Sequence, residues 1–213
     1  MFLVIDGIDA SWKTTQVELL SHRLQELWKT VKLVDFPRYD EKSSCFVQKY
    51  LSGDYGKEVS AELSSLFYAL DRYDASFELQ KDIQNYDYVI SNRYVSANMT
   101  HHGCKIQNQE ERQQFFDWLE NMEYKICSIP RPDAIIFLSL SFENNLELIE
   151  KRAQEKGISV LDLHERNTDY MKKAWETAHQ IAKQYDWEIV ECETEGKLLE
   201  RSVITEKILQ KIF

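Results

Sequence analysis

A short apolar run that breaks into a glycine and then into a Lys-Thr-Thr helix start constrains this chain more than any other stretch. Residues 2–5 (FLVI) are too few to span a membrane, and an uninterrupted apolar run is typical of a strand buried on both faces of a parallel sheet. Residues 7–14 then nearly match the template of a phosphate-binding loop, in which a glycine and four residues precede Gly-Lys-Ser/Thr. Lys13 and Thr14 fit this template, whereas Trp12 stands where it has a second glycine.

Each position of the template has a physical reason. Consecutive backbone N–H groups curl around a phosphate at the positive end of a helix, Lys13 adds a point charge, and the hydroxyl of Thr14 helps to hold Mg²⁺. The second glycine lets the backbone pass close to the phosphate in a conformation that a side chain resists, so an indole at Trp12 is an objection to nucleotide binding. The alternative is a strand, a turn and a helix in which Lys13 is only a solvated residue of the first turn.

Glycine is scarce in a chain that should need it at its turns. Only 6 of the 213 residues are glycine, which is less than half of the ~7% usual in proteins. Trp12 and Trp28 both stand where glycine would be natural, the first in the loop and the second where a helix ends and a strand begins. We hypothesise that both are glycines in the organism's own protein, through a stop codon that is reassigned to glycine but translated as tryptophan. Ordinary substitution is the alternative.

Length and charge limit the classes of protein to which the chain can belong. At 213 residues we expect one α/β domain over residues 1–213. A net charge of -10 argues against a general nucleic-acid binder, which needs a basic face. The cysteines form no CxxC pair, no basic-then-apolar leader precedes the first strand, and no apolar run approaches the ~18 residues of a membrane span. We therefore expect a cytoplasmic protein with reduced thiols that binds neither nucleic acid nor membrane.

Hydrophobic periodicity predicts strands that alternate with helices along the whole chain. Strands are expected at residues 2–5, 31–36, 87–91, 134–140 and 187–190. Helices are expected at residues 14–27, 43–51, 60–84, 142–154, 170–185 and 198–213. Because parallel strands are joined by crossovers that are almost always right-handed, this order predicts a three-layer α/β/α fold with a five-stranded parallel sheet.

Polar residues follow two of the predicted strands, at the edge where open α/β sheets bind ligands. FPRY (36–39) ends the second strand, and Arg38 can offer a planar guanidinium fork to a phosphate; the alternative is a surface arginine beside a turn. NRY (92–94) ends the third strand, with His101 and His102 just beyond. Two adjacent histidines are more often surface residues than a metal site, because a helix points them in different directions.

With these pieces in place, the chain resembles the thymidylate kinases, of the nucleoside-monophosphate kinase group, over nearly its whole length. The resemblance is carried by the loop and, in order, by FPRY (36–39), YLSGDYG (50–56), ALDR (69–72), NRYVSAN (92–98), IPRPD (129–133) and LDLHE (161–165). None of these segments is specific alone, but their order and spacing are. The resemblance implies a P-loop kinase fold with a mobile lid at about residues 153–168, ATP as phosphoryl donor and Mg²⁺ as cofactor.

The resemblance also implies which residues bind the donor. ATP would be held by Gly7, Ile8, Asp9, Ala10, Ser11, Trp12, Lys13, Thr14 and Thr15. Thr14 and the lid residue Glu165 would lie near the metal. Some family members place an arginine at the position of Ala10, so here cations of the lid would supply that charge. The residues implied in catalysis are Lys13, Arg93, Arg152 and Arg166.

The implied acceptor site is drawn from separate segments. It comprises Asp9, Arg38, Tyr39, Tyr68, Arg72, Arg93, Asn98 and His101. Its three arginines would surround the acceptor phosphate and the transferred group. Tyr68 would stack on thymine, and Asn98 would read the edge of the base. Asp9 would meet the sugar 3′-hydroxyl, and His101 would crowd the 2′ position and so favour deoxyribose.

Two departures from the family pattern accompany Trp12. The usual aspartate before Arg-Tyr is Asn92, which removes a carboxylate that can orient a metal-bound water or assist the acceptor oxygen. The segment VSAN (95–98) swaps the usual order of alanine and serine.

The leading expectation is a homodimeric kinase that converts dTMP to dTDP with ATP. Two alternatives stay open. One is a related kinase with another deoxynucleotide or deoxynucleoside as acceptor. The other is a catalytically impaired nucleotide-binding homologue, which Trp12 and Asn92 favour.

Overall fold

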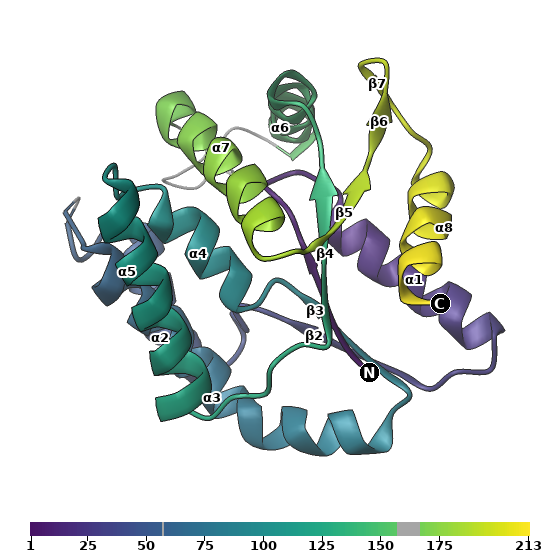
Figure 1. The fold of residues 1–213 in the computed structure, drawn as a ribbon, viewed down its shortest axis with the longest axis horizontal. Helices are drawn as coiled ribbons and strands as arrows, with labels where there is room; N and C mark the ends of the chain where they lie inside the picture. Colours follow the sequence, from purple (N-terminus) through teal and green to yellow (C-terminus); the bar gives the residue numbers. More distant parts are fainter. Residues whose placement is uncertain (57, 157–166) are drawn as a thin grey trace.

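A central parallel sheet lies between two layers of helices in the computed structural model, which describes residues 1–56, 58–156 and 167–213 (Figure 1). The strands of the sheet are β1 (Phe2–Asp6), β2 (Val31–Asp35), β3 (Tyr88–Asn92), β4 (Ala134–Ser139) and β5 (Glu188–Glu191). The α-helices are α1 (Lys13–Glu26), α2 (Cys45–Ser52), α3 (Ala61–Asn85), α4 (Val95–Gly103), α5 (Gln109–Glu120), α6 (Phe142–Lys156), α7 (Thr168–Gln184) and α8 (Arg201–Ile212). Shorter elements are a 3-10 turn (Lys42–Ser44), a π-helical segment (Asn121–Ile126) and the hairpin of β6 (Glu193–Thr194) and β7 (Lys197–Leu198).

The five strands run in the order β2-β3-β1-β4-β5, and every neighbouring pair is parallel. β1 occupies the centre, and all five of its residues are buried, which explains its uninterrupted apolar sequence. The predicted three-layer fold with a five-stranded parallel sheet is therefore confirmed.

Alternate residues of β1 face different helix layers. Leu3 and Ile5 pack in a core with α1 and α8, whereas Phe2 and Val4 pack with α3, α4, α5 and α7. Each of these four side chains is at most 1% exposed, and burial of a large apolar side chain contributes roughly 1.5–3 kcal/mol. The central strand thus ties both layers together.

The structure contains elements that hydrophobic periodicity does not reveal. α4 buries Ser96, Asn98 and Thr100 as well as apolar residues, so it lacks a simple apolar stripe. The predicted helix at 198–213 begins only at Arg201, because Leu198 pairs in the β6–β7 hairpin. Of the predicted lid, the end of α6 and the start of α7 are described, whereas Glu165 and Arg166 lie outside the described residues.

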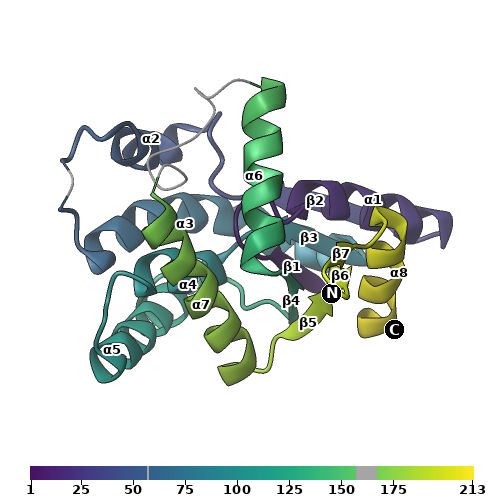
Figure 2. The same cartoon turned by 90° about the horizontal axis from the view of Figure 1, so that it is seen from above.

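The carboxyl ends of the strands point toward α6 and the β6–β7 hairpin, which lie at the top of Figure 1. Figure 2 views the molecule from this side, with α6 in front of the sheet. None of the described helices combines the length and the apolar character that crossing a bilayer requires.

Candidate functional site

A cavity of about 940 Å³ opens at the carboxyl ends of the strands, between the loop after β1 and helices α3, α4 and α6. The predicted site residues that line it are Asp9, Ala10, Ser11, Trp12, Lys13, Thr14, Thr15, Tyr39, Tyr68, Arg72, Arg93, Asn98, His101 and Arg152. Lining residues outside the predicted set include Asp35, His102, Glu147, Glu155 and Arg201. The place of Asp35 directly before FPRY, at the end of a strand, was a signal that could have identified it.

The loop between β1 and α1 adopts backbone conformations that favour glycine. Ala10 and Trp12 have φ angles of 60° and 61°, a region that costs a residue with a Cβ about 1–2 kcal/mol. At Gly7, whose φ is +154°, an added Cβ would lie 2.6 Å from Ser11 Oγ and 3.0 Å from the carbonyl oxygen of Leu138. Two residues of the loop therefore adopt the left-handed conformation, and tryptophan occupies one of these strained positions.

The indole of Trp12 lies on the side of the loop that faces α8. It packs against the core shared by α1 and α8, and the guanidinium carbon of Arg201 lies 5.6 Å from the ring centroid, as in a cation–π contact. The indole also forms part of the cavity wall. The side chain that bridges the loop is that of Lys13, not that of Trp12.

Lys13 folds back over the loop, where its Nζ donates hydrogen bonds to the carbonyl oxygens of Gly7 (2.9 Å) and Ile8 (2.6 Å). The residue is 6% exposed, so the alternative of a solvated first-turn lysine is wrong. Burial and then the charge of Arg93 lower the pKa of Lys13 to about 7, although Asp9 opposes them. An anion bound beside this buried amine would favour its charged form.

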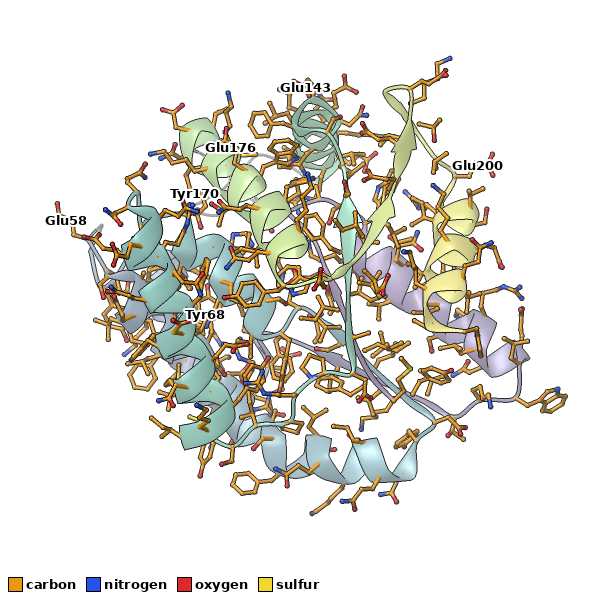
Figure 3. All side chains as sticks on the ribbon, in the orientation of Figure 1. Glu58, Tyr68, Glu143, Tyr170, Glu176 and Glu200 are labelled. Carbon is orange, nitrogen blue, oxygen red and sulfur yellow. The ribbon has the colours of Figure 1, made fainter. Side chains whose placement is uncertain are left out.

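An ion pair joins Asp9 of the loop to Arg93 at the end of β3. Nη2 of Arg93 donates a hydrogen bond to the Asp9 carboxylate, and its Nη1 lies 3.1 Å from Nε2 of His101. Burial raises the pKa of Asp9, but Arg93, His101 and Lys13 together hold it well below its usual range. The Tyr170 hydroxyl on α7 donates to the His101 carbonyl oxygen at 2.8 Å and so ties α7 to this cluster (Figure 3).

The inner wall of the cavity is formed by α3 and α4. The rings of Tyr68, labelled in Figure 3, and His102 lie 5.4 Å apart between centroids. Nδ1 of His102 lies 3.1 Å from Ser64 Oγ, and His102 is only 2% exposed. The interpretation of the histidine pair as surface residues is therefore wrong for His102. Asn98 donates from Nδ2 to the Ser65 carbonyl oxygen at 3.1 Å.

The two other predicted arginines are held by carboxylates of their own. Arg72 is 2% exposed and forms a bidentate pair with Glu123, while one side of it lines the cavity. Arg38 lies outside the lining of the cavity, because Nε and Nη2 donate to Asp71 (3.1 Å) and Asp74 (2.6 Å) of α3. Of the three arginines predicted to converge on one point, Arg72 and Arg93 line the same cavity, whereas Arg38 does not.

Oxygen atoms gather in the corner between β2, β3 and the first turn of α1. Asn92 donates from Nδ2 to Thr14 Oγ1 at 3.3 Å. Its Oδ1 is buried and accepts no hydrogen bond from the described residues. Asp35 is the register partner of Asn92 in the neighbouring strand and also lines the cavity. Within the described ranges, no three His, Cys, Asp or Glu side chains form a metal cluster, so a metal here would rely on mixed protein oxygens and ligand oxygens.

Comparison with known proteins points to one family. A family model described as thymidylate kinase matches residues 5–203. The thymidylate kinase of Mycobacterium tuberculosis is 28% identical over 187 residues, which cover 86% of each chain. That of Prochlorococcus marinus is 27% identical over 199 residues, which cover 89% of this chain and 86% of its own.

A solved structure of thymidylate kinase from Candida albicans shares the fold. Its TM-score is 0.72 at 22% sequence identity, and the match covers 99% of this chain and 90% of that one. The family model spans nearly the whole length, from the first strand to the last helix. This chain therefore belongs to the thymidylate kinase family.

Proposed function

We propose that the cavity transfers the γ-phosphoryl group of ATP to dTMP by means of the residues described above. Membership of the thymidylate kinase family makes the chain a phosphotransferase that converts dTMP to dTDP. The observation that carries the proposed site is the meeting of Lys13, Asp9 and Arg93 at one cavity. The comparisons do not favour the alternative acceptors or a loss of catalysis.

The donor phosphates are proposed to lie in the loop of residues 7–15. Its backbone N–H groups and the N-terminus of α1 favour an anion. Nζ of Lys13 now contacts the carbonyl oxygens of Gly7 and Ile8, and exchanging these for a phosphate oxygen would restore its full charge. Trp12 and Arg201 form the adjoining wall.

The acceptor is proposed to lie between α3, α4 and the Asp9–Arg93 pair. Tyr68 offers an aromatic face for the base, and Asn98 offers an amide for its edge. Asp9 is held ionised by Arg93, so its carboxylate can accept a hydrogen bond from the sugar 3′-hydroxyl. His101 lies beside this pair and would restrict the 2′ position.

The residues of the oxygen-rich corner fit Mg²⁺. The buried Oδ1 of Asn92, which accepts no hydrogen bond from the described residues, is an oxygen whose burial a hydrated cation would compensate. Thr14 and Asn92 would face the cation with oxygen atoms, the element that Mg²⁺ prefers as a ligand. When bound, the cation neutralises charge on the β- and γ-phosphate oxygens.

In the transfer, an oxygen of the dTMP phosphate bonds to the γ-phosphorus while the bond to the β,γ-bridging oxygen breaks and ADP leaves. The protein's part is to position both nucleotides and to stabilise charge on the equatorial oxygens. Arg93 lies where the two sites meet, and Arg152 reaches the same cavity from α6. Arg166, which lies outside the described residues, is proposed to join them from the lid.

The function is tested by measuring phosphoryl transfer from ATP to dTMP, dUMP, dCMP and thymidine under identical conditions. We expect the highest kcat/KM with dTMP. A clear preference for any other acceptor would contradict the proposed acceptor. Binding of dTMP without turnover would support the catalytically impaired homologue instead.

We also propose that the protein is a homodimer that pairs through α3. Large apolar side chains recur along this helix at spacings of three and four, and each is at least 36% exposed in the single chain: Leu63, Leu66, Leu70, Tyr73 and Phe77. Such a stripe suits packing against a second helix. We expect a dimer in sedimentation velocity, a monomer for Leu70→Glu, and a dimer for the control Val203→Glu on α8. A monomeric starting protein would refute this pairing.

The proposed location is the cytoplasm. All four cysteines are free, and two of them, Cys104 and Cys192, are buried. Free buried thiols suit a reducing compartment, where nucleotide substrates are also found.

A further inference from the structure

The corner of the cavity between β2 and β3 contains the carboxylate of Asp35, which the predicted site does not include. Asp35 and Asn92 end neighbouring parallel strands and are partners in register. Register partners project from the same face of the pleat, so their side chains lie side by side. Both residues line the cavity together with Thr14.

Strand register and one hydrogen bond bring these three residues together. Asp35 lies beside Asn92 in register, and Asn92 donates from Nδ2 to the hydroxyl of Thr14 at 3.3 Å. The Thr14 hydroxyl therefore keeps a lone pair for another partner. With the buried Asn92 Oδ1, which accepts nothing from the described part of the chain, the corner presents a carboxylate, an amide oxygen and a hydroxyl.

The charge of Asp35 is not fully compensated by its neighbours. Arg93 is already engaged by Asp9, and Lys13 by loop carbonyl oxygens. Among the described residues, Asp35 therefore offers the corner a carboxylate that Arg93 and Lys13 do not hold in an ion pair.

We propose that Asp35 is the residue that positions the hydrated divalent cation beside the donor phosphates, in place of the aspartate that the family carries at the position of Asn92. The carboxylate of Asp35 stands at the end of the adjacent strand, beside Asn92, whose amide donates to Thr14. This inference rests on the proposed function, because it needs the donor phosphates in the loop.

The test measures Mn²⁺ affinity by electron paramagnetic resonance on the full chain saturated with ADP. We expect Asp35→Asn to weaken Mn²⁺ binding by about tenfold or more, the usual effect of losing a positioning carboxylate. The double variant Asp35→Asn with Asn92→Asp moves the carboxylate to the next strand and should recover most of the affinity. Asp40→Asn makes the same chemical change at an exposed site nearby and should leave the affinity unaltered.

Unchanged Mn²⁺ affinity in Asp35→Asn, or a loss that the double variant does not recover, overturns the proposal. Thermal unfolding of each variant separates a folding defect from a cation defect. In steady-state assays, Asp35→Asn should raise the KM for Mg·ATP and leave the KM for dTMP unchanged. Failure of the starting protein to phosphorylate dTMP would refute the proposed function, while the Mn²⁺ comparison would still report on Asp35.

A second, independent observation concerns the five tryptophans, which fall into two groups. Three have a clear place in the packing: Trp118 stacks on Phe115, Trp175 donates from Nε1 to the Leu140 carbonyl oxygen at 2.7 Å, and Trp187 is buried in the core. The other two are Trp12 and Trp28, and each has a φ of 61°.

Trp28 occupies a position that helices reserve for glycine. It follows the C-cap of α1, where its N–H donates to the Gln25 carbonyl oxygen (2.9 Å) and the N–H of Lys29 donates to that of Leu24 (3.1 Å). These are the two hydrogen bonds of a Schellman motif, whose left-handed residue is usually glycine. The indole of Trp28 is 94% exposed, so packing provides no compensation for the strain.

The geometry points to glycine at positions 12 and 28 of the natural protein, with a stop codon reassigned to glycine and translated here as tryptophan. Peptide mass spectrometry of the protein isolated from its source organism tests this directly. We expect glycine at 12 and 28 and tryptophan at 118, 175 and 187. Tryptophan at either position 12 or position 28 overturns the inference.

Discussion

At the scale of single residues, two cations, Lys13 and Arg93, lie near one carboxylate, Asp9, at the loop after β1. Asp9 pairs with Arg93, which leaves Lys13 next to a second positive charge inside a buried site. The ammonium of Lys13 donates hydrogen bonds to carbonyl oxygens of its own loop. A phosphate would therefore replace weak neutral acceptors with an anion.

We predict that ATP binding takes up a proton at about pH 8. The pKa of Lys13 is lowered to about 7 by burial and Arg93, so the free amine is largely neutral above that pH, and an anionic ligand favours its charged form. Below about pH 6 the amine is already protonated and the uptake should vanish. Calorimetry in buffers of different ionisation enthalpy measures it, and Lys13→Met controls for protons carried by the nucleotide. Equal heats in all buffers at about pH 8 would contradict this.

Trp12→Gly should strengthen ATP binding by about an order of magnitude or more. The substitution opens the cavity wall beside the loop and lets the backbone pass closer to a phosphate. Affinity for dTMP should not change, because Trp12 is not part of the proposed acceptor site. Calorimetric titration with each nucleotide checks both statements, and equal ATP affinities in the two proteins would show the indole to be harmless.

Arg93→Ala should lower kcat roughly 100-fold or more, because we propose that its guanidinium donates at the point where charge develops. The domain should still unfold cooperatively, since the Arg93–Asp9 pair is partly exposed. Arg131→Ala, which removes a surface cation far from the loop, is the matched control. Wild-type turnover in Arg93→Ala would remove this residue from the site.

At the scale of elements, α3 is fixed to the π-helical segment Asn121–Ile126 by a buried ion pair. Glu123 is fully buried, and it satisfies two nitrogens of Arg72. Burial lowers the pKa of Arg72, but the charge of Glu123 raises it above its ordinary value. The pair therefore holds a charged guanidinium at the cavity wall.

Glu123→Ala should reduce the free energy of unfolding by about 3–5 kcal/mol, because it leaves a buried guanidinium without its carboxylate. Glu120→Ala removes a nearby glutamate whose pair with Arg131 is exposed, and it should cost less than about 1 kcal/mol. Urea denaturation of both variants gives the comparison. Similar losses of unfolding free energy in the two variants would show that the buried pair stabilises the fold no more than the exposed pair.

At the scale of the whole molecule, an acidic chain must bind two anionic nucleotides. The net charge is -10, yet cations from four separate elements or their junctions reach one cavity: Lys13, Arg93, Arg152 and Arg201. The parallel sheet makes this possible because the carboxyl ends of its strands meet at one edge. Attraction for the substrates is therefore local and independent of the overall charge.

The sequence by itself determined the layered fold and the family. Apolar runs, amphipathic spacing and the loop template are local signals, so five strands and their order along the chain could be predicted from residues near one another. The strained positions of Trp12 and Trp28 were also visible, since glycine signals in loops and helix ends are local. The helices α4 and α5 were not predicted, and the buried face of α4 is partly polar.

Only the tertiary structure decided which charged groups meet. Arg72 and Glu123 are 51 residues apart, and Asp9 and Arg93 are 84 apart. Asp35 lies beside Asn92 because β2 and β3 pair in one particular register. Such partners depend on long-range packing, and no pattern within a short window specifies which of several carboxylates a buried arginine will contact.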